Sequence, residues 1–253
     1  RPASNASIAA NDVCRDILLR NNPLQRGQES ARVPDRQIPA TGVAVQEPTY
    51  GTCQVRLTHN GQKAGDEKSH RSDYSPRLYR ATAVAEGEGD RMRHEYSRRQ
   101  AFNADNSRIL MYASNGYWHL YDGHTGKYLK QLQGPAGDAE PQWHPTDPDL
   151  LYFLPRDGIG MQIYQLDLRT NQVSVVADMG PQIQQHWPDA SVASTRSEGS
   201  PSADGRYWCF MARAMVDNGS WPMRGVFTWD LQEQRIVGTL NQDGTPDHVS
   251  MSP

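Results

Sequence analysis

The sequence of 253 residues has little cysteine and phenylalanine, little net charge and no long apolar run. Its three cysteines are too few for a fold held together by disulfides. No apolar run approaches the length of about 20 residues that a membrane-spanning helix needs, so we expect no membrane span. A formal net charge of −3 gives no electrostatic reason to expect a nucleic-acid partner.

The sequence also lacks the short motifs of several common enzyme classes. It contains no G-x-S-x-G elbow, no P-loop and no G-x-G-x-x-G segment after a strand. Neither H-x-x-x-H nor C-x-x-C spacing is present. The cofactor is therefore unknown, and a divalent cation such as Ca²⁺, Mn²⁺ or Zn²⁺ at a histidine cluster stays an open question.

The first residues and the cysteines both bear on the cellular compartment. The opening run R-P-A-S-N-A-S-I-A-A is small and polar, like a mature N-terminus after signal removal, although a trimmed fragment would look the same. We therefore expect a secreted or periplasmic protein. In an oxidising compartment Cys14 and Cys53 are candidates for a disulfide, with three unpaired thiols as the alternative. Cys209 lies in an apolar strand and is expected to be a buried thiol.

The composition changes along the chain, and we predict an N-terminal extension over residues 1–45 and a β-propeller domain over 46–253. Residues 11–20 are predicted to form a short helix with Asn11 as N-cap. Residues 50–58 alternate with period two and predict a strand. Residues 59–93 are charged and glycine-rich, which is typical of a long loop.

An internal repeat follows from about residue 93. Each copy has a turn with an aspartate, a buried strand, a strand that ends in aspartate, and a last strand. The turn aspartates are Asp105, Asp147 and Asp204; the strands are 109–112, 150–154 and 207–211, then 118–122, 162–167 and 226–230, then 128–132, 172–176 and 235–240. Four strands at a period of about 40 to 60 residues are typical of propeller blades. We expect the turn aspartates to bind backbone amides at tight corners.

The predicted fold class is all-β, a β-propeller of four-stranded antiparallel blades that is incomplete in this chain. About three full blades plus partial ones fall short of the roughly four to eight blades of a closed ring. Residues 246–253 align with 140–145 as the start of another copy. Either a further segment of a longer chain or another chain would complete the ring, and we favour the longer chain.

The repeats resemble those of TolB-like propellers, P-x-W-S-P-D-G-x-x-I-A-F followed by L-Y-x-x-D-x-x-T-G. Pro141–Asp147 and Leu120–Gly126 carry the resemblance most clearly, within residues 93–253. More narrowly, Arg93–Ser97 and Trp143–Asp149 resemble segments of secreted bacterial propeller polysaccharide lyases of the oligogalacturonate and ulvan lyase type. That resemblance implies β-elimination of uronic-acid polymers, with His and Tyr acting beside Arg or a metal at the central face.

Segments beside the innermost strands line the central channel of a propeller, so polar residues there converge from distant parts of the chain. The predicted catalytic residues are His94 and Tyr96, as base and acid, and Arg98, which neutralises the substrate carboxylate. The predicted substrate-binding residues are Arg99, Glu140, His144, Arg196 and His248. The alternative for each histidine is a hydrogen bond to a neighbouring blade.

Other histidines and tryptophans are weaker candidates. His119 and His124 are expected at the surface, the first on the outward side of a strand and the second in a hairpin turn. The tryptophans of the later copies are expected to pack between blades rather than to stack on sugar rings, and these are Trp187, Trp208, Trp221 and Trp229.

Two functions of different kinds follow from these observations. The first is a secreted or periplasmic lyase whose partner is an acidic polysaccharide or oligosaccharide. The alternative is a non-catalytic TolB-like propeller that binds proteins or glycans. The polar residues near His94 favour the enzyme, and the lack of a complete catalytic signature favours the binding module.

Overall fold

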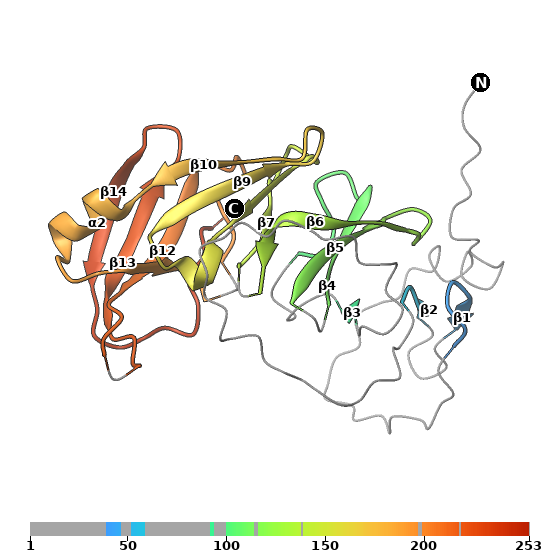
Figure 1. Cartoon of the computed structure of the whole chain (residues 1–253), viewed down its shortest axis with the longest axis horizontal. Helices are drawn as coiled ribbons and strands as arrows, with labels where there is room; N and C mark the ends of the chain where they lie inside the picture. Colours follow the sequence, from blue (N-terminus) through green and yellow to red (C-terminus); the bar gives the residue numbers. More distant parts are fainter. Residues whose placement is uncertain are drawn as a thin grey trace, which may run out of the picture.

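The computed structural model describes residues 39–46, 52–58, 92–93, 100–113, 116–137, 139–196, 199–217 and 219–252. These ranges consist mainly of antiparallel β-sheets (Figure 1), which confirms the all-β prediction. The predicted helix over 11–20 and most of the predicted loop over 59–93 lie outside the described residues. The division into an extension and a propeller domain stays a prediction.

A small sheet of two strands comes first in the described part of the chain. β1 (Ala44–Gln46) pairs antiparallel with β2 (Cys53–Val55), which lies inside the strand predicted over 50–58. Leu57, just after β2, packs against Ile109 and Met111 of the first large sheet. Cys53 is disulfide-bonded and Cys209 is a free thiol, whereas Cys14 lies outside the described residues.

Three larger sheets follow, each with four antiparallel strands in chain order. The first contains β3 (Met92–Arg93), β4 (Arg108–Ala113), β5 (Tyr117–Asp122) and β6 (Tyr128–Ala136). The second contains β7 (Gln142–Trp143), β8 (Leu150–Phe153), β9 (Gln162–Asp167) and β10 (Gln172–Asp178). The third contains β11 (Val192–Ser194), β12 (Tyr207–Arg213), β13 (Met223–Asp230) and β14 (Arg235–Asn241).

This order matches the predicted blades, because all nine longer strands expected from the repeat are present. The described residues do not close a ring. Two further elements are present: the short 3-10 helix η2 (Pro155–Gly158) between β8 and β9 of the second sheet, and the helix α2 (Gly180–His186) between the second and third sheets. The sequence had not indicated either element.

Apolar cores hold neighbouring large sheets together. Between the first and second sheets lie Leu110, Trp118, Leu151 and Phe153, each at most 2% exposed. Burying one large side chain of this kind contributes about 1.5–3 kcal/mol.

The second interface joins the middle sheet to the third. There Tyr152 meets Trp208 with ring centroids 5.5 Å apart and the rings edge to face, a favourable arrangement for aromatic pairs. Phe210 and Phe227 extend this core along the third sheet. The middle sheet is thus buried on both faces.

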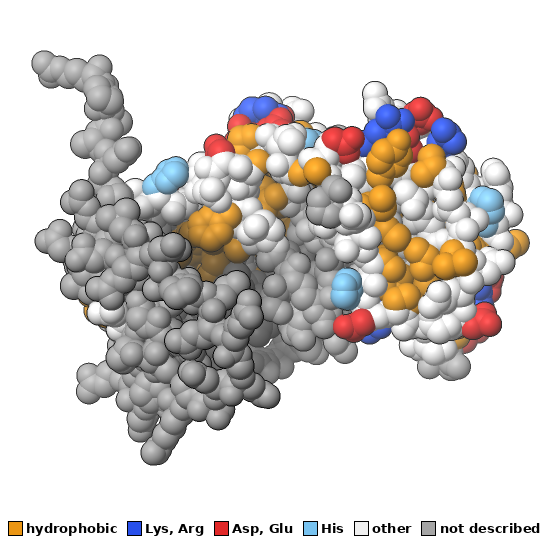
Figure 2. Space-filling view, turned by 180° about the vertical axis from the view of Figure 1, so that it is seen from behind, with side chains coloured by type: hydrophobic (Ala, Val, Ile, Leu, Met, Phe, Trp, Pro, Cys, Tyr) orange, Lys and Arg blue, Asp and Glu red, His pale blue; other side chains and the backbone are white. Residues whose placement is uncertain are grey.

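The turns between strands form a charged edge. Asp105, Asp147 and Asp204 each accept a hydrogen bond from the backbone N–H two residues later, as predicted for corner residues. Arginines pair with carboxylates at the same turns, for example Arg108 with Asp149 at 2.7 Å. Figure 2 shows blue and red side chains grouped along this edge. We conclude that the turn aspartates are structural.

Candidate functional site

The predicted site residues fall into two groups. His94, Tyr96, Arg98 and Arg99 lie outside the described residues, so their roles stay predictions. The structure describes the other four. Glu140 and His144 lie on either side of the short strand β7, Arg196 lies after the short strand β11, and His248 lies in the segment that follows β14.

Glu140 joins the second sheet to the third. It lies two residues before the start of strand β7 and is 2% exposed. Its Oε2 accepts hydrogen bonds from the backbone N–H and from the hydroxyl of Thr195, both at 2.9 Å. Thr195 follows β11 directly. The first strands of two sheets are therefore tied together by one buried carboxylate.

Arg196 extends this connection to the end of the described chain. Its Nη1 donates to the carbonyl oxygen of Pro246 at 3.2 Å. Pro246 begins the segment that carries His248, which is exposed. The structure thus brings Glu140, Arg196 and the backbone leading to His248 to the end of β11.

His144 lies at the other end of β7 from Glu140, in the corner turn that leads to β8. Its Nδ1 accepts hydrogen bonds from the backbone N–H groups of Thr146 (3.1 Å) and Asp147 (2.9 Å). Burial lowers the pKa of His144, and the Asp147 carboxylate opposes this effect. The imidazole therefore supports a turn in this structure, and its role in substrate binding stays a prediction.

The sequence did not single out Arg213, which is the charged side chain of greatest interest near β11. It ends β12 and is only 9% exposed. Its Nη2 donates to Ser194 Oγ at 2.6 Å. Its Nε has no hydrogen-bond partner among the described residues. A buried guanidinium with an unused donor is costly unless another group is bound there.

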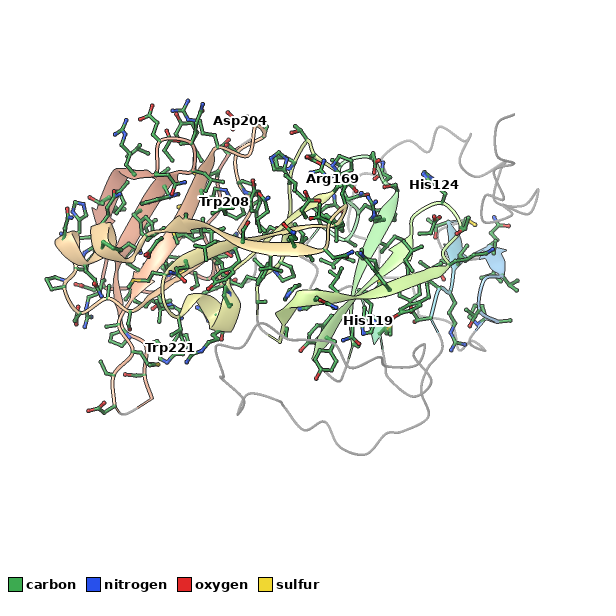
Figure 3. All side chains as sticks on the ribbon, turned by 45° about the horizontal axis from the view of Figure 1, so that its top comes forward. His119, His124, Arg169, Asp204, Trp208 and Trp221 are labelled. Carbon is green, nitrogen blue, oxygen red and sulfur yellow. The ribbon has the colours of Figure 1, made fainter. Side chains whose placement is uncertain are left out.

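Trp221 covers the guanidinium of Arg213. The Cζ of Arg213 lies 5.0 Å from the centroid of the Trp221 ring, within range of a cation–π interaction. Trp187, Trp208 and Trp229 are at most 7% exposed and pack between sheets, as predicted. Trp221 differs because it is half-buried. In Figure 3 it lies on the side of the molecule opposite to Asp204 and the charged edge.

Charges of both signs surround Arg213. Burial lowers its pKa, the carboxylates of Glu140 and Asp157 raise it, and the Arg196 guanidinium lowers it. A guanidinium nevertheless stays protonated at any physiological pH. The cluster of Glu140, Asp157, Arg196 and Arg213 therefore presents a fixed cation next to carboxylates and an aromatic ring, which suits a ligand with a carboxylate and an apolar ring face.

The backbone near this cluster adopts a conformation that non-glycine residues avoid. Glu140, Arg156, Asp157 and Arg196 have φ angles of 45°, 60°, 55° and 58°. Each such residue costs on the order of 1 kcal/mol or more, and such residues concentrate at functional sites. Their position around β11 supports the cluster as a candidate site.

Gln142 is a second buried side chain with an unused donor, two residues after Glu140. It belongs to β7, is 7% exposed, and its Nε2 has no partner within the described part of the chain. A signal for Arg213 was available, because it is the single charge in the apolar run Tyr207–Arg213.

His119 corrects one expectation. It was expected at the surface but is 2% exposed, and its Nδ1 lies 3.3 Å from the hydroxyl of Tyr128. The reason is that β5 lies inside a sheet covered on both faces, so the outward side of its alternation is also buried. His124, in contrast, is exposed in its turn as expected.

Two further features concern metals and membranes. Within the described ranges, no group of three or more His, Cys, Asp or Glu is placed to hold a metal ion. No described helix is long and apolar enough to cross a membrane.

Comparisons with known proteins complete the description of the site. No protein-family model matches the chain, and no curated protein matches it. Among solved structures, it is similar to an oligogalacturonate lyase in complex with manganese (16% identity, TM-score 0.41), with 60% of this chain and 42% of that chain covered.

Two other solved structures show a comparable degree of similarity. For the oligogalacturonate lyase of Vibrio parahaemolyticus the identity is 9% and the TM-score 0.40, with 58% of this chain and 40% of that chain covered. For the dihydro-heme d1 dehydrogenase NirN the identity is 17% and the TM-score 0.37, with 62% and 30% covered. The chain spans less than half the length of each of these three proteins.

Proposed function

We propose that this chain is part of a propeller polysaccharide lyase that cleaves a uronic-acid-containing polysaccharide by β-elimination. The observation that carries the proposal is Arg213, a buried guanidinium with an unused Nε donor beside Ser194 and under the Trp221 ring. A uronate offers a carboxylate for such a cation and a ring face for such an indole.

The reaction would use the cation in a specific way. A base removes the proton from the carbon next to the uronate carboxylate, and the electron pair forms a C=C bond as the bond to the glycosidic oxygen breaks. The departing oxygen then takes a proton from an acid. Negative charge builds up on the carboxylate before the bond breaks, so a guanidinium positioned there stabilises the transition state.

The acid and base are the predicted His94 and Tyr96, with Arg98 as a second cation for the carboxylate. In the sequence these three residues lie between β3 and β4, the first two strands of the first large sheet. Arg99, Glu140, His144, Arg196 and His248 remain the proposed substrate-binding residues. Of these, Glu140 is buried and bonded to Thr195, and Arg196 bonds the Pro246 carbonyl oxygen.

A secreted or periplasmic location is part of the proposal. The disulfide bond of Cys53 supports it, because disulfides persist mainly in oxidising compartments. An acidic polysaccharide would also be met outside the cytoplasm.

The second candidate is a non-catalytic propeller that binds proteins or glycans. One observation favours it: among the described residues, the charges that act on Arg213 come from carboxylates and guanidinium, and no imidazole is among them. Such a cluster offers cations to an anion and lacks the imidazole that the proposed elimination uses.

The experiment that separates the two candidates is a direct assay for β-elimination. The full-length protein is incubated with pectate, ulvan, alginate and glycosaminoglycans, and the ultraviolet absorbance of the new C=C bond is followed. We expect a steady rise with at least one polymer. No rise with any polymer, together with retained binding of a uronate oligomer, would establish the binding module instead.

A further inference from the structure

The corner turns before β4, β8 and β12 each carry a polar side chain at the same position. These residues are Asn103, His144 and Ser202. Each donates its backbone N–H to the carbonyl oxygen of the first residue of the strand that follows, at 3.2, 3.0 and 2.9 Å. The three side chains therefore occupy equivalent places in the repeat and can be compared directly.

The first and third corners are closed by side chains that do not titrate near neutral pH. Asn103 Oδ1 accepts a hydrogen bond from the backbone N–H of Arg108, and Ser202 Oγ accepts one from that of Tyr207, both at 2.9 Å. An amide oxygen and a hydroxyl oxygen remain acceptors at any physiological pH. These two corners have no group at this position that acid would change.

The second corner is closed by an imidazole instead. His144 Nδ1 accepts hydrogen bonds from the backbone N–H groups of Thr146 (3.1 Å) and Asp147 (2.9 Å), and the Thr146 hydroxyl lies 3.3 Å from the same atom. A ring nitrogen accepts only while it carries no proton, so the single proton of this ring is on Nε2. A second proton would bind Nδ1 and point at two N–H donors. Protonation of His144 and closure of this turn therefore exclude each other.

The ring of His144 is also in contact with its neighbours outside the turn. Its centroid lies 5.6 Å from that of Tyr152 in β8. On the side of the third sheet, a Cβ built on Gly205 would lie 3.2 Å from His144 Nε2 and 3.4 Å from Pro145. The second corner thus packs against the third, and a change in the position of the ring affects both.

The groups of its own sheet act on the ring in opposite directions. Burial lowers the pKa of His144, and the Asp147 carboxylate raises it, but burial is the larger effect. Asp147 is shared with Arg169, whose Nη1 lies 3.3 Å from its Oδ2. Burial and Asp147 both raise the pKa of Tyr152, so its phenol stays neutral. The neutral imidazole is therefore favoured in the closed corner.

The charged groups of the third corner are engaged with each other. Asp204 accepts a hydrogen bond from the hydroxyl of Ser202, and Arg206 pairs with Asp230 at 2.6 Å. In Figure 3 Asp204 and Arg169 lie on the same side of the molecule, along the row of corners. Among the described residues, the charge that acts on His144 is that of Asp147.

We propose that His144 is a pH-sensitive cap, whose protonation in mildly acidic solution releases the N–H groups of Thr146 and Asp147 and opens the corner between β7 and β8. The equivalent corners at Asn103 and Ser202 stay closed under the same conditions. Because the ring also contacts the third corner, opening loosens the edge at which the second and third sheets meet. This inference does not depend on the proposed function.

The direction of the pH effect follows from the state that binds the proton better. A histidine in an unfolded chain has a pKa of about 6.5. The pKa of His144 in the closed corner is lower, so an open corner takes up a proton more readily. The contribution of the cap is therefore complete above about pH 6.5 and is lost as the pH falls below that value.

Amide hydrogen exchange of the intact chain, followed by NMR at about pH 7.5 and about pH 5, tests the proposal because exchange reports local opening. After correction for intrinsic exchange, we expect the protection of the Thr146 and Asp147 amides to fall by about tenfold or more at the lower pH, the equivalent of one pKa unit. The amides of Arg108 and Tyr207, bonded by the caps that do not titrate, should keep their protection. No fall at Thr146 and Asp147, or an equal fall at all three corners, would overturn the inference.

Substitutions of the cap give a second measurement. His144→Asn gives this corner the side chain that the first corner carries, and it should keep both amides protected at both pH values. His144→Ala removes the acceptor and should leave them unprotected at both. His124→Asn is the matched control, because His124 is exposed in a hairpin turn, and it should respond to acid as the unsubstituted chain does. An acid response that persists in a folded His144→Asn variant would contradict the role of His144.

Discussion

The carboxylate of Glu140 accepts two hydrogen bonds from Thr195, one from its backbone N–H and one from its hydroxyl, both 2.9 Å long. The two residues belong to different sheets and are at most 2% exposed. Because both donors are buried, they depend on this carboxylate for a partner. The two bonds therefore tie the segment before β7 to the end of β11, next to Ser194, which accepts the hydrogen bond of Arg213.

Replacing Glu140 should destabilise the chain more than replacing an exposed glutamate. Glu140→Ala leaves both donors of Thr195 without their acceptor, and we expect a loss of about 1–3 kcal/mol in the free energy of unfolding. Glu140→Gln retains one acceptor oxygen and should cost less. Urea denaturation measures both values.

Glu233→Ala is the control for Glu140. Glu233 is exposed and forms surface ion pairs with Arg206 (3.1 Å) and Arg235 (2.7 Å). Such pairs contribute about 0–1 kcal/mol, so the variant should stay close to the unsubstituted chain. Equal losses for Glu140→Ala and Glu233→Ala would contradict the structural role of Glu140.

A side chain at Gly158 should destabilise the chain more than a side chain at Gly160. A Cβ on Gly158 would lie 1.8 Å from the carbonyl oxygen of Ala193 in β11, while a Cβ on Gly160 would meet nothing within 4 Å. Both have positive φ angles, of 82° and 92°. Gly160→Ala therefore isolates the conformational cost, about 1–2 kcal/mol.

We expect Gly158→Ala to cost about 3 kcal/mol or more, because the backbone of β11 must also move. Thermal and urea unfolding of the two alanine variants provide the comparison. If both variants lost the same stability, the close approach of Gly158 to β11 would not exist in solution.

The ion pair of Arg206 and Asp230 predicts a stability change at acidic pH. Hydrogen bonds from Arg206, and then from the backbone of Glu233 and Gln232, lower the pKa of Asp230 to about 2. An aspartate has a pKa of about 3.9 in an unfolded chain. A group with a depressed folded pKa stabilises the fold above the unfolded value and loses this contribution as pH falls.

Asp230→Asn should therefore destabilise the chain by a constant amount above about pH 5, and the difference should shrink as pH falls from about 4 to about 2. Thermal unfolding as a function of pH gives the result. Asp243→Asn removes an exposed negative charge and serves as the control. A difference that grew toward pH 2 would have the wrong sign for this ion pair.

Much of the fold could be predicted from the sequence, because the long strands carry strong local signals. Aspartate-containing turns such as the one at Asp147 set the register of the copies, and apolar runs such as Tyr207–Arg213 mark the strands. The first strands were not separately predicted, since β7 and β11 have only 2 and 3 residues. A period-two pattern needs about 4 residues or more to be recognised.

The candidate site was only partly predictable. Glu140 and Arg196 were chosen because they flank innermost strands, and the structure brings both near Arg213. Arg213 and Trp221 meet through a connection between β12 and β13, and nothing in their spacing indicates that contact. For His119 the prediction of exposure was wrong. Alternation within a strand shows which residues share a face of the sheet, but not whether another part of the chain covers that face.

Arg213 should control the binding of uronate oligomers without controlling the fold. Arg213→Met keeps the volume but removes the charge and its donors, and we expect binding of a galacturonate trimer to weaken by about 10- to 100-fold. Arg213→Lys keeps the charge without the planar donor geometry, so its affinity should be intermediate. Isothermal titration calorimetry measures the dissociation constants, and a melting curve of each variant confirms that it is folded.

The control for this experiment is Arg235→Met, which removes an exposed arginine paired with Glu233 on β14. It should bind the trimer as tightly as the unsubstituted chain, because a distant surface charge contributes little once salt screens it. The affinity of the unsubstituted chain should itself fall as salt is added, since the contact is between charges. If Arg213→Met folds and binds the trimer as tightly as Arg235→Met does, the Nε of Arg213 takes no part in binding. The carboxylates of the trimer are then bound elsewhere.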